Sequence, residues 1–130
     1  MPNKPLIAIV DDDASVREAI MSLVRASGFM AEAFPCAEDF LKSDGVLRTS
    51  CLVADFRMPG MSGLELYRCL IASGEPIPTI LITAHSDEWV RARALKTGIL
   101  CYLTKPFDED DLLGCIRSAL DHGKARDSGP

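Results

Sequence analysis

Several residues capable of chemistry stand at the ends of short apolar runs in this sequence. They are three consecutive carboxylates, a fourth carboxylate, a hydroxyl and an ammonium: Asp11, Asp12, Asp13, Asp55, Thr83 and Lys105. Carboxylates can act as nucleophiles and as ligands of hard cations, and an ammonium can neutralise phosphoryl oxygens. Brought together, these side chains would form a site for phosphoryl chemistry. Whether they meet depends on the elements that carry them.

The apolar runs have the composition of strands buried on both faces, because they are continuous rather than alternating. We predict strands at 6–10, 30–34, 51–54, 79–83 and 101–104. Between these runs, apolar residues recur at three- and four-residue steps, which predicts helices. The helices are expected from a cap at Ser15 to the residue before Gly28, at 38–42, at 63–70, at 87–96, and from a cap at Asp108 to about residue 120.

This alternation predicts a doubly wound α/β fold, since right-handed crossovers place helices on both faces of a parallel sheet. We expect a flavodoxin-like sheet of five strands in the order 2-1-3-4-5, with five helices. Ligands of such sheets bind beyond the carboxyl ends of the strands, where the order reverses. Strands one and three are neighbours there, so Asp11, Asp12 and Asp55 should gather. Their mutual repulsion favours binding of a hard divalent cation such as Mg²⁺.

The composition is that of one globular domain in the cytoplasm. The formal net charge of −5 argues against nucleic-acid binding by this chain. No signal-peptide pattern is present, and no apolar run is long enough to cross a membrane. We expect a domain at 1–122 and a flexible polar tail at 123–130. The scattered cysteines are expected to be buried free thiols: Cys36, Cys51, Cys69, Cys101 and Cys115.

Taken together, the motifs resemble the receiver domain of two-component response regulators, in particular the subfamily that usually precedes a helix-turn-helix output domain. The likeness runs from about residue 6 to about residue 120. It rests on Ile-Val-Asp-Asp-Asp at 9–13, Asp-Phe-Arg-Met-Pro-Gly-Met-Ser-Gly at 55–63, Ile-Thr-Ala-His at 82–85 and Leu-Thr-Lys-Pro-Phe at 103–107. The combination of these segments, with their intervals, is far more specific than any one of them.

The resemblance implies that Asp55 is the phosphoacceptor. It also implies that Mg²⁺, or Mn²⁺ in its place, is bound by Asp12, Asp55 and the backbone carbonyl of Arg57, with Asp11 acting through a water molecule. Phosphoryl oxygens would then be held by the side chains of Thr83 and Lys105 and by backbone groups of Ala84 and Met58. The 58–60 segment looks like the family's turn beside the site, and the bond before Pro106 is a candidate for the cis form.

In the family, the phosphoryl group draws the hydroxyl of the strand-four threonine inward and lets an aromatic residue on strand five turn inward. Thr83 and Tyr102 occupy these positions, and Tyr102 could equally be an ordinary half-buried strand residue. Arg57 and His85 stand where the family tunes the lifetime of the phosphoryl group. The family's partner face would include Arg91, Leu95 and Tyr102.

The implied function is to accept a phosphoryl group from a sensor histidine kinase or a histidine phosphotransfer protein, with possible phosphorylation-dependent homodimerisation. Such a chain is a signalling domain that catalyses only its own phosphorylation and dephosphorylation. A stand-alone receiver and a part of a transcriptional regulator both fit the sequence. Trp89 could contact a partner or simply lie on the helix surface.

Three other interpretations remain open. A haloacid-dehalogenase-like phosphatase would use Asp11 as its nucleophile, because 11–15 partly match that group's Asp-x-Asp-x-Thr motif. It would leave Asp55 unexplained. A receiver-like module could bind partners without phosphorylation. A flavin-binding protein of the same fold is disfavoured, because no phosphate-binding loop rich in Ser, Thr or Gly follows the first strand.

Overall fold

The computed structural model describes residues 4–85 and 87–128, with side chains as far as Asp121. Its strands are β1 (Leu6–Val10), β2 (Met30–Phe34), β3 (Thr49–Asp55), β4 (Thr79–Thr83) and β5 (Cys101–Thr104). Its helices are α1 (Ala14–Ala26), α2 (Ala37–Lys42), the 3-10 helix η1 (Asp44–Arg48), α3 (Gly63–Ala72), α4 (Glu88–Thr97) and α5 (Glu109–Ser128).

The five strands form one parallel sheet in the order β2-β1-β3-β4-β5, which confirms the predicted flavodoxin-like topology. The bounds of β1, β2, β4 and β5 agree with those expected from the apolar runs. The third strand is longer than predicted and includes Asp55 as its last residue. Because Val10 pairs with Ala54 in the register of β1 and β3, the residues that follow them come out at the same edge of the sheet.

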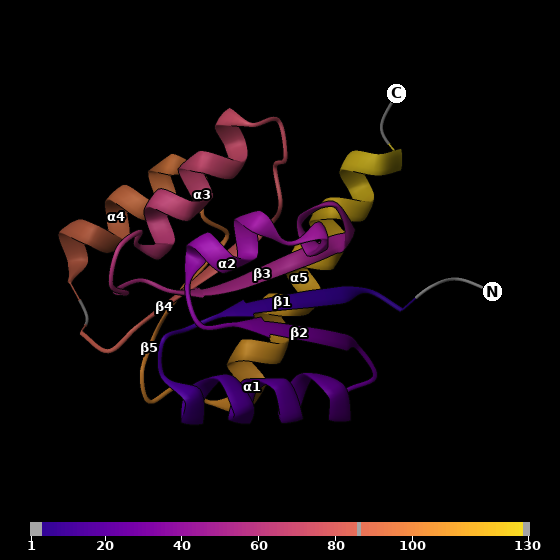
Figure 1. Ribbon diagram of the computed structural model, residues 1–130, viewed down its shortest axis with the longest axis horizontal. Coiled ribbons are helices and arrows are strands. Elements are labelled where there is room, and N and C mark those ends of the chain that lie inside the picture. The colour runs from indigo at the N-terminus through magenta and orange to yellow at the C-terminus, as the bar shows by residue number, and fades with distance from the viewer. Residues whose placement is uncertain (1–3, 86, 129–130) are drawn as a thin grey trace.

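The hydrophobic core has two halves, one on each face of the sheet. Helices α2, α3 and α4 cover one face, and α1 lies on the opposite side (Figure 1) with α5. Successive strand residues alternate between the two halves, so Ala8 and Val10 pack under α2 and α3 while Ile7 and Ile9 pack against α1 and α5. Burial on both faces explains why these strands are continuously apolar.

The first helix begins earlier than the sequence indicated. We expected a cap at Ser15, but the cap is Asp13, whose carboxylate accepts hydrogen bonds from the backbone N–H groups of Ser15 (2.9 Å) and Val16 (3.3 Å). Both residue types are good caps, and only the extended backbone at Asp13 decides between them.

The last helix runs further than the sequence indicated. Its backbone is helical to Ser128, through most of the segment that we expected to be a tail at 123–130, so the expected end of the helix was wrong. Good helix formers such as Lys124, Ala125 and Arg126 follow Gly123 and allow the helix to continue. The flexibility of this segment stays a prediction.

The cysteines are all free, as predicted, but they are not uniformly buried. Cys51 lies fully within the core, where burial raises the pKa of its thiol, and the other four are half-buried. The expectation of five buried thiols was therefore wrong for four of them, because sequence composition alone does not place a small residue at the core or its rim. No helix within the described part of the chain is long and apolar enough to span a membrane.

Candidate functional site

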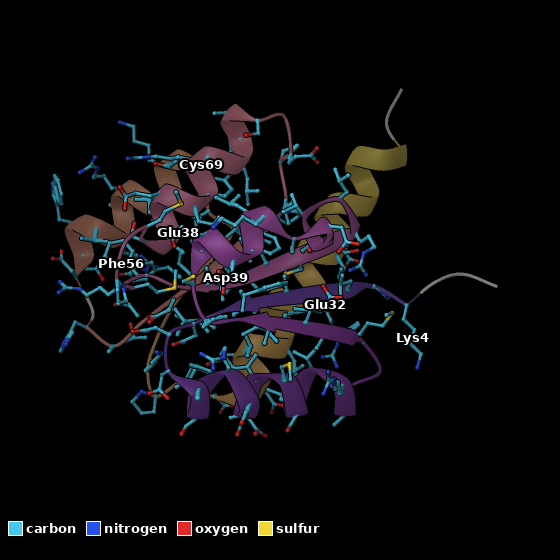
Figure 2. All side chains as sticks on the ribbon, in the orientation of Figure 1. Lys4, Glu32, Glu38, Asp39, Phe56 and Cys69 are labelled. Carbon is cyan, nitrogen blue, oxygen red and sulfur yellow. The ribbon has the colours of Figure 1, made fainter. Side chains whose placement is uncertain are left out.

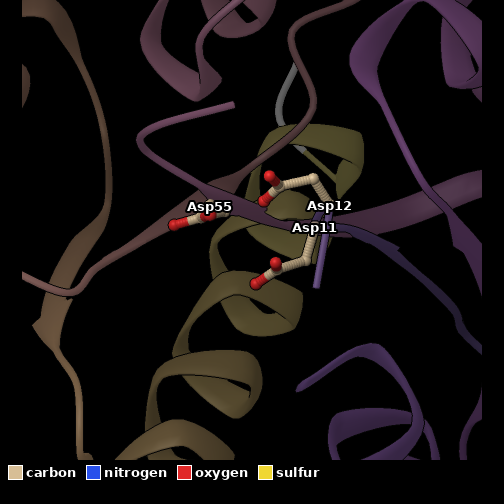
Figure 3. A group of neighbouring side chains, drawn as sticks. All are labelled: Asp11, Asp12 and Asp55. Atoms are coloured by element: carbon tan, nitrogen blue, oxygen red, sulfur yellow. The ribbon is translucent and has the colours of Figure 1, made fainter. Parts of the chain in front are cut away.

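Three carboxylates gather at the edge of the sheet where β1 and β3 end. One oxygen each of Asp11, Asp12 and Asp55 lies within 4.8 Å of the others (Figure 3). Asp11 and Asp12 follow β1 directly and Asp55 closes β3, so the adjacency of these two strands produces the cluster. Three carboxylate oxygens so disposed fit the preference of Mg²⁺ for hard oxygen ligands, and these residues could hold such an ion.

A lysine from the end of the sheet faces this cluster. The Lys105 ammonium lies 3.3 Å from Asp11 Oδ2 and 3.6 Å from Asp55 Oδ1. Its backbone N–H donates to the carbonyl of Thr83 at 2.7 Å, and the following peptide bond to Pro106 is cis, as the sequence suggested. The side chain of Lys105 is only 22% exposed, so its charge is poorly screened by solvent.

The electrostatic balance of the cluster is unfavourable to a charged Asp55. Burial first, and then the negative charge of Asp11, raise the pKa of the Asp55 carboxyl from its ordinary value near 3.8 to about 6, and Lys105 only partly opposes them. Asp55 is 8% exposed. The Lys105 ammonium therefore does not offset the burial of Asp55 together with the negative charges of its neighbours, and an added cation would stabilise the ionised form.

Asp11 differs from its two neighbours because both of its oxygens are already engaged. Oδ1 accepts the backbone N–H of Asp13 at 2.8 Å, and Oδ2 accepts a hydrogen bond from Lys105. The Arg17 guanidinium, on α1, donates to the Asp11 carbonyl at 2.7 Å. Asp12 is exposed, and Asp11 is 2% exposed. Sequence reasoning missed Arg17, whose position one helical turn into α1 carries no signal of this contact.

The loop that follows Asp55 is packed against the backbone of the cluster. Gly63 donates its N–H to the Phe56 carbonyl at 3.1 Å, and a Cβ atom on Gly63 would lie 2.5 Å from the carbonyl oxygen of Asp55. The position therefore leaves no room for a side chain. Met58 is buried in this loop and Arg57 is exposed. The sequence motif included Gly63 but did not reveal this close approach.

Thr83 and Tyr102 lie near each other, on neighbouring strands beside the site. The Thr83 hydroxyl is buried, donates to the carbonyl of His85 at 3.1 Å and accepts the N–H of His85 at 3.2 Å. The Tyr102 hydroxyl is also buried and makes no hydrogen bond of accepted geometry among the described residues. Burial raises the pKa of this phenol, an effect that the nearby Thr83 hydroxyl partly opposes.

The residues expected after β4 at the site and those expected on the α4 part of the partner face are exposed. Ala84 and His85 follow β4, and their exposure leaves the rim of the site open to solvent. Arg91 and Leu95 lie on α4, which packs beside β5, the strand that carries Tyr102. Arg91 pairs with Glu88 at 3.9 Å. Leu95 is 37% exposed, a large apolar side chain left partly uncovered.

Trp89 also lies on the surface of α4. Its ring is 68% exposed, and the guanidinium carbon of Arg93 lies 5.0 Å from the ring centroid. Such a cation–π contact stabilises an exposed ring by roughly 0.5–1 kcal/mol. The pairing accounts for the exposed ring without requiring a partner, and the two interpretations of Trp89 stay open.

The comparisons with known proteins agree with this geometry. Residues 7–117 match the family model for the response regulator receiver domain. This chain belongs to the response regulator receiver family. It is 49% identical over 115 residues to the response regulator protein TmoT of Ectopseudomonas mendocina, a match that covers 88% of this chain and 52% of TmoT. The receiver domain spans about half the length of the curated relatives that it matches.

Solved structures show the same relationship. A structure of the response regulator StyR superposes with a TM-score of 0.87 at 46% identity, over 95% of this receiver and 62% of the StyR chain. The structure titled FixJ-N superposes with a TM-score of 0.84 at 35% identity, over 94% of this receiver and 97% of that chain. The protein is thus the receiver domain of a two-component response regulator, a signalling module rather than a classical enzyme.

We predict that Asp55→Asn stabilises the fold in the absence of divalent cations at pH 7. The folded-state pKa of about 6 lies above the ordinary value near 3.8, so ionisation of Asp55 lowers the stability as the pH rises between these values. Removing the charge should raise the unfolding free energy by roughly 1–2 kcal/mol, after allowance for solvent screening. Chemical unfolding in chelator at pH 4 and pH 7 measures the effect.

The matched control is Asp39→Asn, at an exposed carboxylate of α2. It should change the unfolding free energy by less than about 0.5 kcal/mol at both pH values. Equal stabilities of Asp55→Asn and the parent protein at pH 7 would contradict the electrostatic account of the cluster.

Proposed function

We propose that the domain accepts a phosphoryl group on Asp55, in a Mg²⁺-dependent transfer from a sensor histidine kinase or a histidine phosphotransfer protein. The observation that carries the proposal is that Asp55 lies close both to two further carboxylates and to the Lys105 ammonium. Membership of the receiver family supports it, because response regulators receive phosphoryl groups from histidine kinases. We place the exchange in the cytoplasm, where five free cysteines stay reduced, and cell fractionation tests this placement.

In the proposed step, an oxygen of the Asp55 carboxylate attacks the phosphorus, the bond from phosphorus to the donor histidine nitrogen breaks, and an acyl phosphate forms. A pKa of about 6 leaves the carboxylate mostly ionised at neutral pH, so no general base is needed. Lys105 neutralises the phosphoryl oxygens, which carry most of the charge in a loose transition state. Thr83 and the backbone of Ala84 and Met58 complete the proposed phosphoryl site.

The proposed metal ligands are Asp12, Asp55 and the carbonyl of Arg57, with Asp11 bound through water. Mg²⁺, or Mn²⁺ in its place, would supply the charge neutralisation that Lys105 alone does not provide. The engaged oxygens of Asp11 support its indirect role, because Asp13 and Lys105 already occupy both. The same engagement and its burial argue against Asp11 as a phosphatase nucleophile.

The first test is phosphorylation by a small acyl-phosphate donor. With Mg²⁺ and acetyl phosphate, mass spectrometry should locate the phosphoryl group on Asp55, because this carboxylate faces both the metal ligands and Lys105. A chelator or Asp55→Asn should abolish the modification. Modification of Asp11 would support the phosphatase interpretation instead. No modification, with partner binding intact, would favour a receiver-like module that acts without phosphorylation.

We further propose that Arg57 and His85 set the lifetime of the phosphoryl group. Both are exposed and follow Asp55 and Thr83 by two residues, at the rim of the site. The acyl phosphate should hydrolyse severalfold faster in Arg57→Ala and in His85→Ala than in the parent protein, because a smaller side chain opens a path for water. Decay of the modified protein after removal of donor gives the rate, with the exposed Arg117→Ala on α5 as the control. Rates equal to that of the parent protein would refute the assignment.

The proposed output is a change of the surface formed by α4, β5 and α5. Phosphorylation would draw the Thr83 hydroxyl from its bonds with His85 and favour an inward Tyr102, a shift between two pre-existing states. The Tyr102 hydroxyl, buried and unpaired within the part of the chain that the structure describes, supports this proposal, because leaving such a group without a partner is unfavourable and a new partner would stabilise another position. Arg91, Leu95 and Tyr102 would contact a partner or a second copy of the chain.

We expect Leu95→Glu to weaken phosphorylation-dependent self-association without slowing the modification of Asp55. A charge on this apolar position would be buried without a partner in the dimer. Thr83→Ala should also lower association while Asp55 remains modifiable. Light scattering before and after acetyl phosphate measures the change, and Leu47→Glu, at an exposed leucine of η1, is the control. Undiminished association of Leu95→Glu would exclude this face.

A further inference from the structure

A glutamate of α2 reaches across to the loop that follows Asp55. Glu38 Oε2 accepts the backbone N–H of Met61 at 3.2 Å. The carboxylate also lies against Gly60, because a Cβ atom on this glycine would be 2.8 Å from the same oxygen. Gly60 has a φ of +79°, a conformation that favours glycine. Close approach of the carboxylate therefore depends on both the backbone conformation and the missing side chain at this position.

The loop at 56–62 is also anchored to β4, where Phe56 donates its N–H to the Ile82 carbonyl at 2.7 Å, and to α3. Gly63 donates to the Phe56 carbonyl, and Ser62 and Glu65 form a reciprocal capping box at 2.9 and 3.1 Å. These bonds fix the two ends of the loop. The hydrogen bond that Met61 donates to Glu38 instead ties the second half of the loop to α2.

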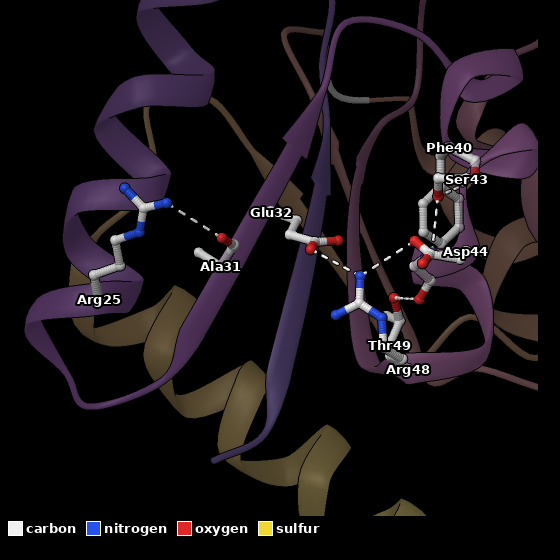
Figure 4. Close-up of polar contacts among 9 residues, drawn as sticks. Arg25, Ala31, Glu32, Phe40, Ser43, Asp44, Arg48 and Thr49 are labelled. Carbon is white, nitrogen blue, oxygen red and sulfur yellow. Dashed lines mark hydrogen bonds and ion pairs between the residues drawn. The ribbon is translucent and has the colours of Figure 1, made fainter. Parts of the chain in front are cut away.

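Helix α2, which carries Glu38, is held in place by core packing and by hydrogen bonds. Its Phe40 is fully buried and meets the ring of Phe34 edge-on, with 5.3 Å between centroids. Ser43 donates to the Phe40 carbonyl at 2.7 Å at the end of the helix (Figure 4). In the same view, Arg48 joins η1 to β2 through Glu32 at 2.9 Å. Glu38 therefore projects from an element whose position is fixed by the core and by the edge of the sheet.

We propose that Glu38 is a positioning residue for the phosphorylation of Asp55. Its hydrogen bond holds the loop so that the carbonyl of Arg57 and the N–H of Met58 keep their place beside the carboxylate cluster. This inference rests on the proposed function of that cluster. Glu38 itself touches none of the reacting atoms, and it acts through the backbone of the loop. Figure 2 shows Glu38 on α2 beside Asp39, its neighbour in the chain.

The proposal makes the length of the side chain decisive, and its charge secondary. Glu38→Ala removes the acceptor, and Glu38→Asp keeps the charge but shortens the reach by one methylene. Glu38→Gln keeps the length and an amide oxygen that accepts the same N–H. Gly60→Ala attacks the contact from the loop side, because its Cβ would displace the carboxylate. Asp39→Asn removes an equal charge one residue away and serves as the control.

Two properties of each full-length variant should be measured: Mg²⁺ affinity by titration calorimetry, and the rate of Asp55 phosphorylation against acetyl phosphate concentration. Loss of one hydrogen bond predicts that Glu38→Ala, Glu38→Asp and Gly60→Ala weaken Mg²⁺ binding and slow phosphorylation by about three- to tenfold. Glu38→Gln and Asp39→Asn should match the parent protein. Unfolding temperatures without Mg²⁺ show whether each variant is folded, so that losses of stability are separated from losses of positioning.

Several outcomes would overturn the inference. Parent-like Mg²⁺ affinity and rate in Glu38→Ala would show that the loop holds its position alone, whatever the change in unfolding temperature. A defect in Glu38→Gln together with normal behaviour of Glu38→Asp would show that charge acts and not the hydrogen bond. If Glu38→Ala does not fold, Glu38→Asp decides, because Gly60→Ala also strains the backbone at a φ of +79°. A parent protein that neither binds Mg²⁺ nor is modified at Asp55 would refute the proposed function itself.

Discussion

Repulsion among three carboxylates at the meeting point of β1 and β3 is the constraint on which the rest of the site depends. The strand order brings Asp11 and Asp12 against Asp55, and the low exposure of Asp55 prevents solvent from screening it. Burial of Asp55 and, after it, the charge of Asp11 raise the pKa of Asp55, and Lys105 offsets only part of their effect. The receiver fold thus maintains a site with an excess of negative charge, which favours the cation binding that we propose.

The same constraint explains how the surrounding elements are arranged. Asp11 is held by the backbone N–H of Asp13, before α1, and by Lys105, which is 94 positions away in the chain. Gly63, at the start of α3, packs closely on the carbonyl of Asp55. Carboxylates that repel each other keep their positions only if the backbone cannot move apart. The close contact at Gly63 and the bond from Glu38 to the loop both restrict such movement.

The link between the site and the surface is short. Thr83 ends β4, and Tyr102 lies in β5 opposite Leu81 of that strand. The threonine hydroxyl is satisfied by local bonds to His85, whereas the tyrosine hydroxyl is buried and has no hydrogen-bond partner among the described residues. In the proposed switch, a new acceptor beside Thr83 would shift the populations of two states that differ by a few kcal/mol. Leu95, exposed on α4, belongs to the surface that we propose a partner contacts after this change.

Sequence alone determined the features that depend on local pattern. Continuous apolar runs predicted the bounds of four strands, and the acidic, hydroxyl and lysine residues at their ends predicted the site, because a strand buried on both faces must be apolar until it reaches the edge of the sheet. Tertiary structure alone decided the rest: the contacts of Arg17, Glu38 and Gly63, and the burial of each cysteine. These features arise between segments distant in the chain, whose approach depends on packing that no short stretch of residues encodes.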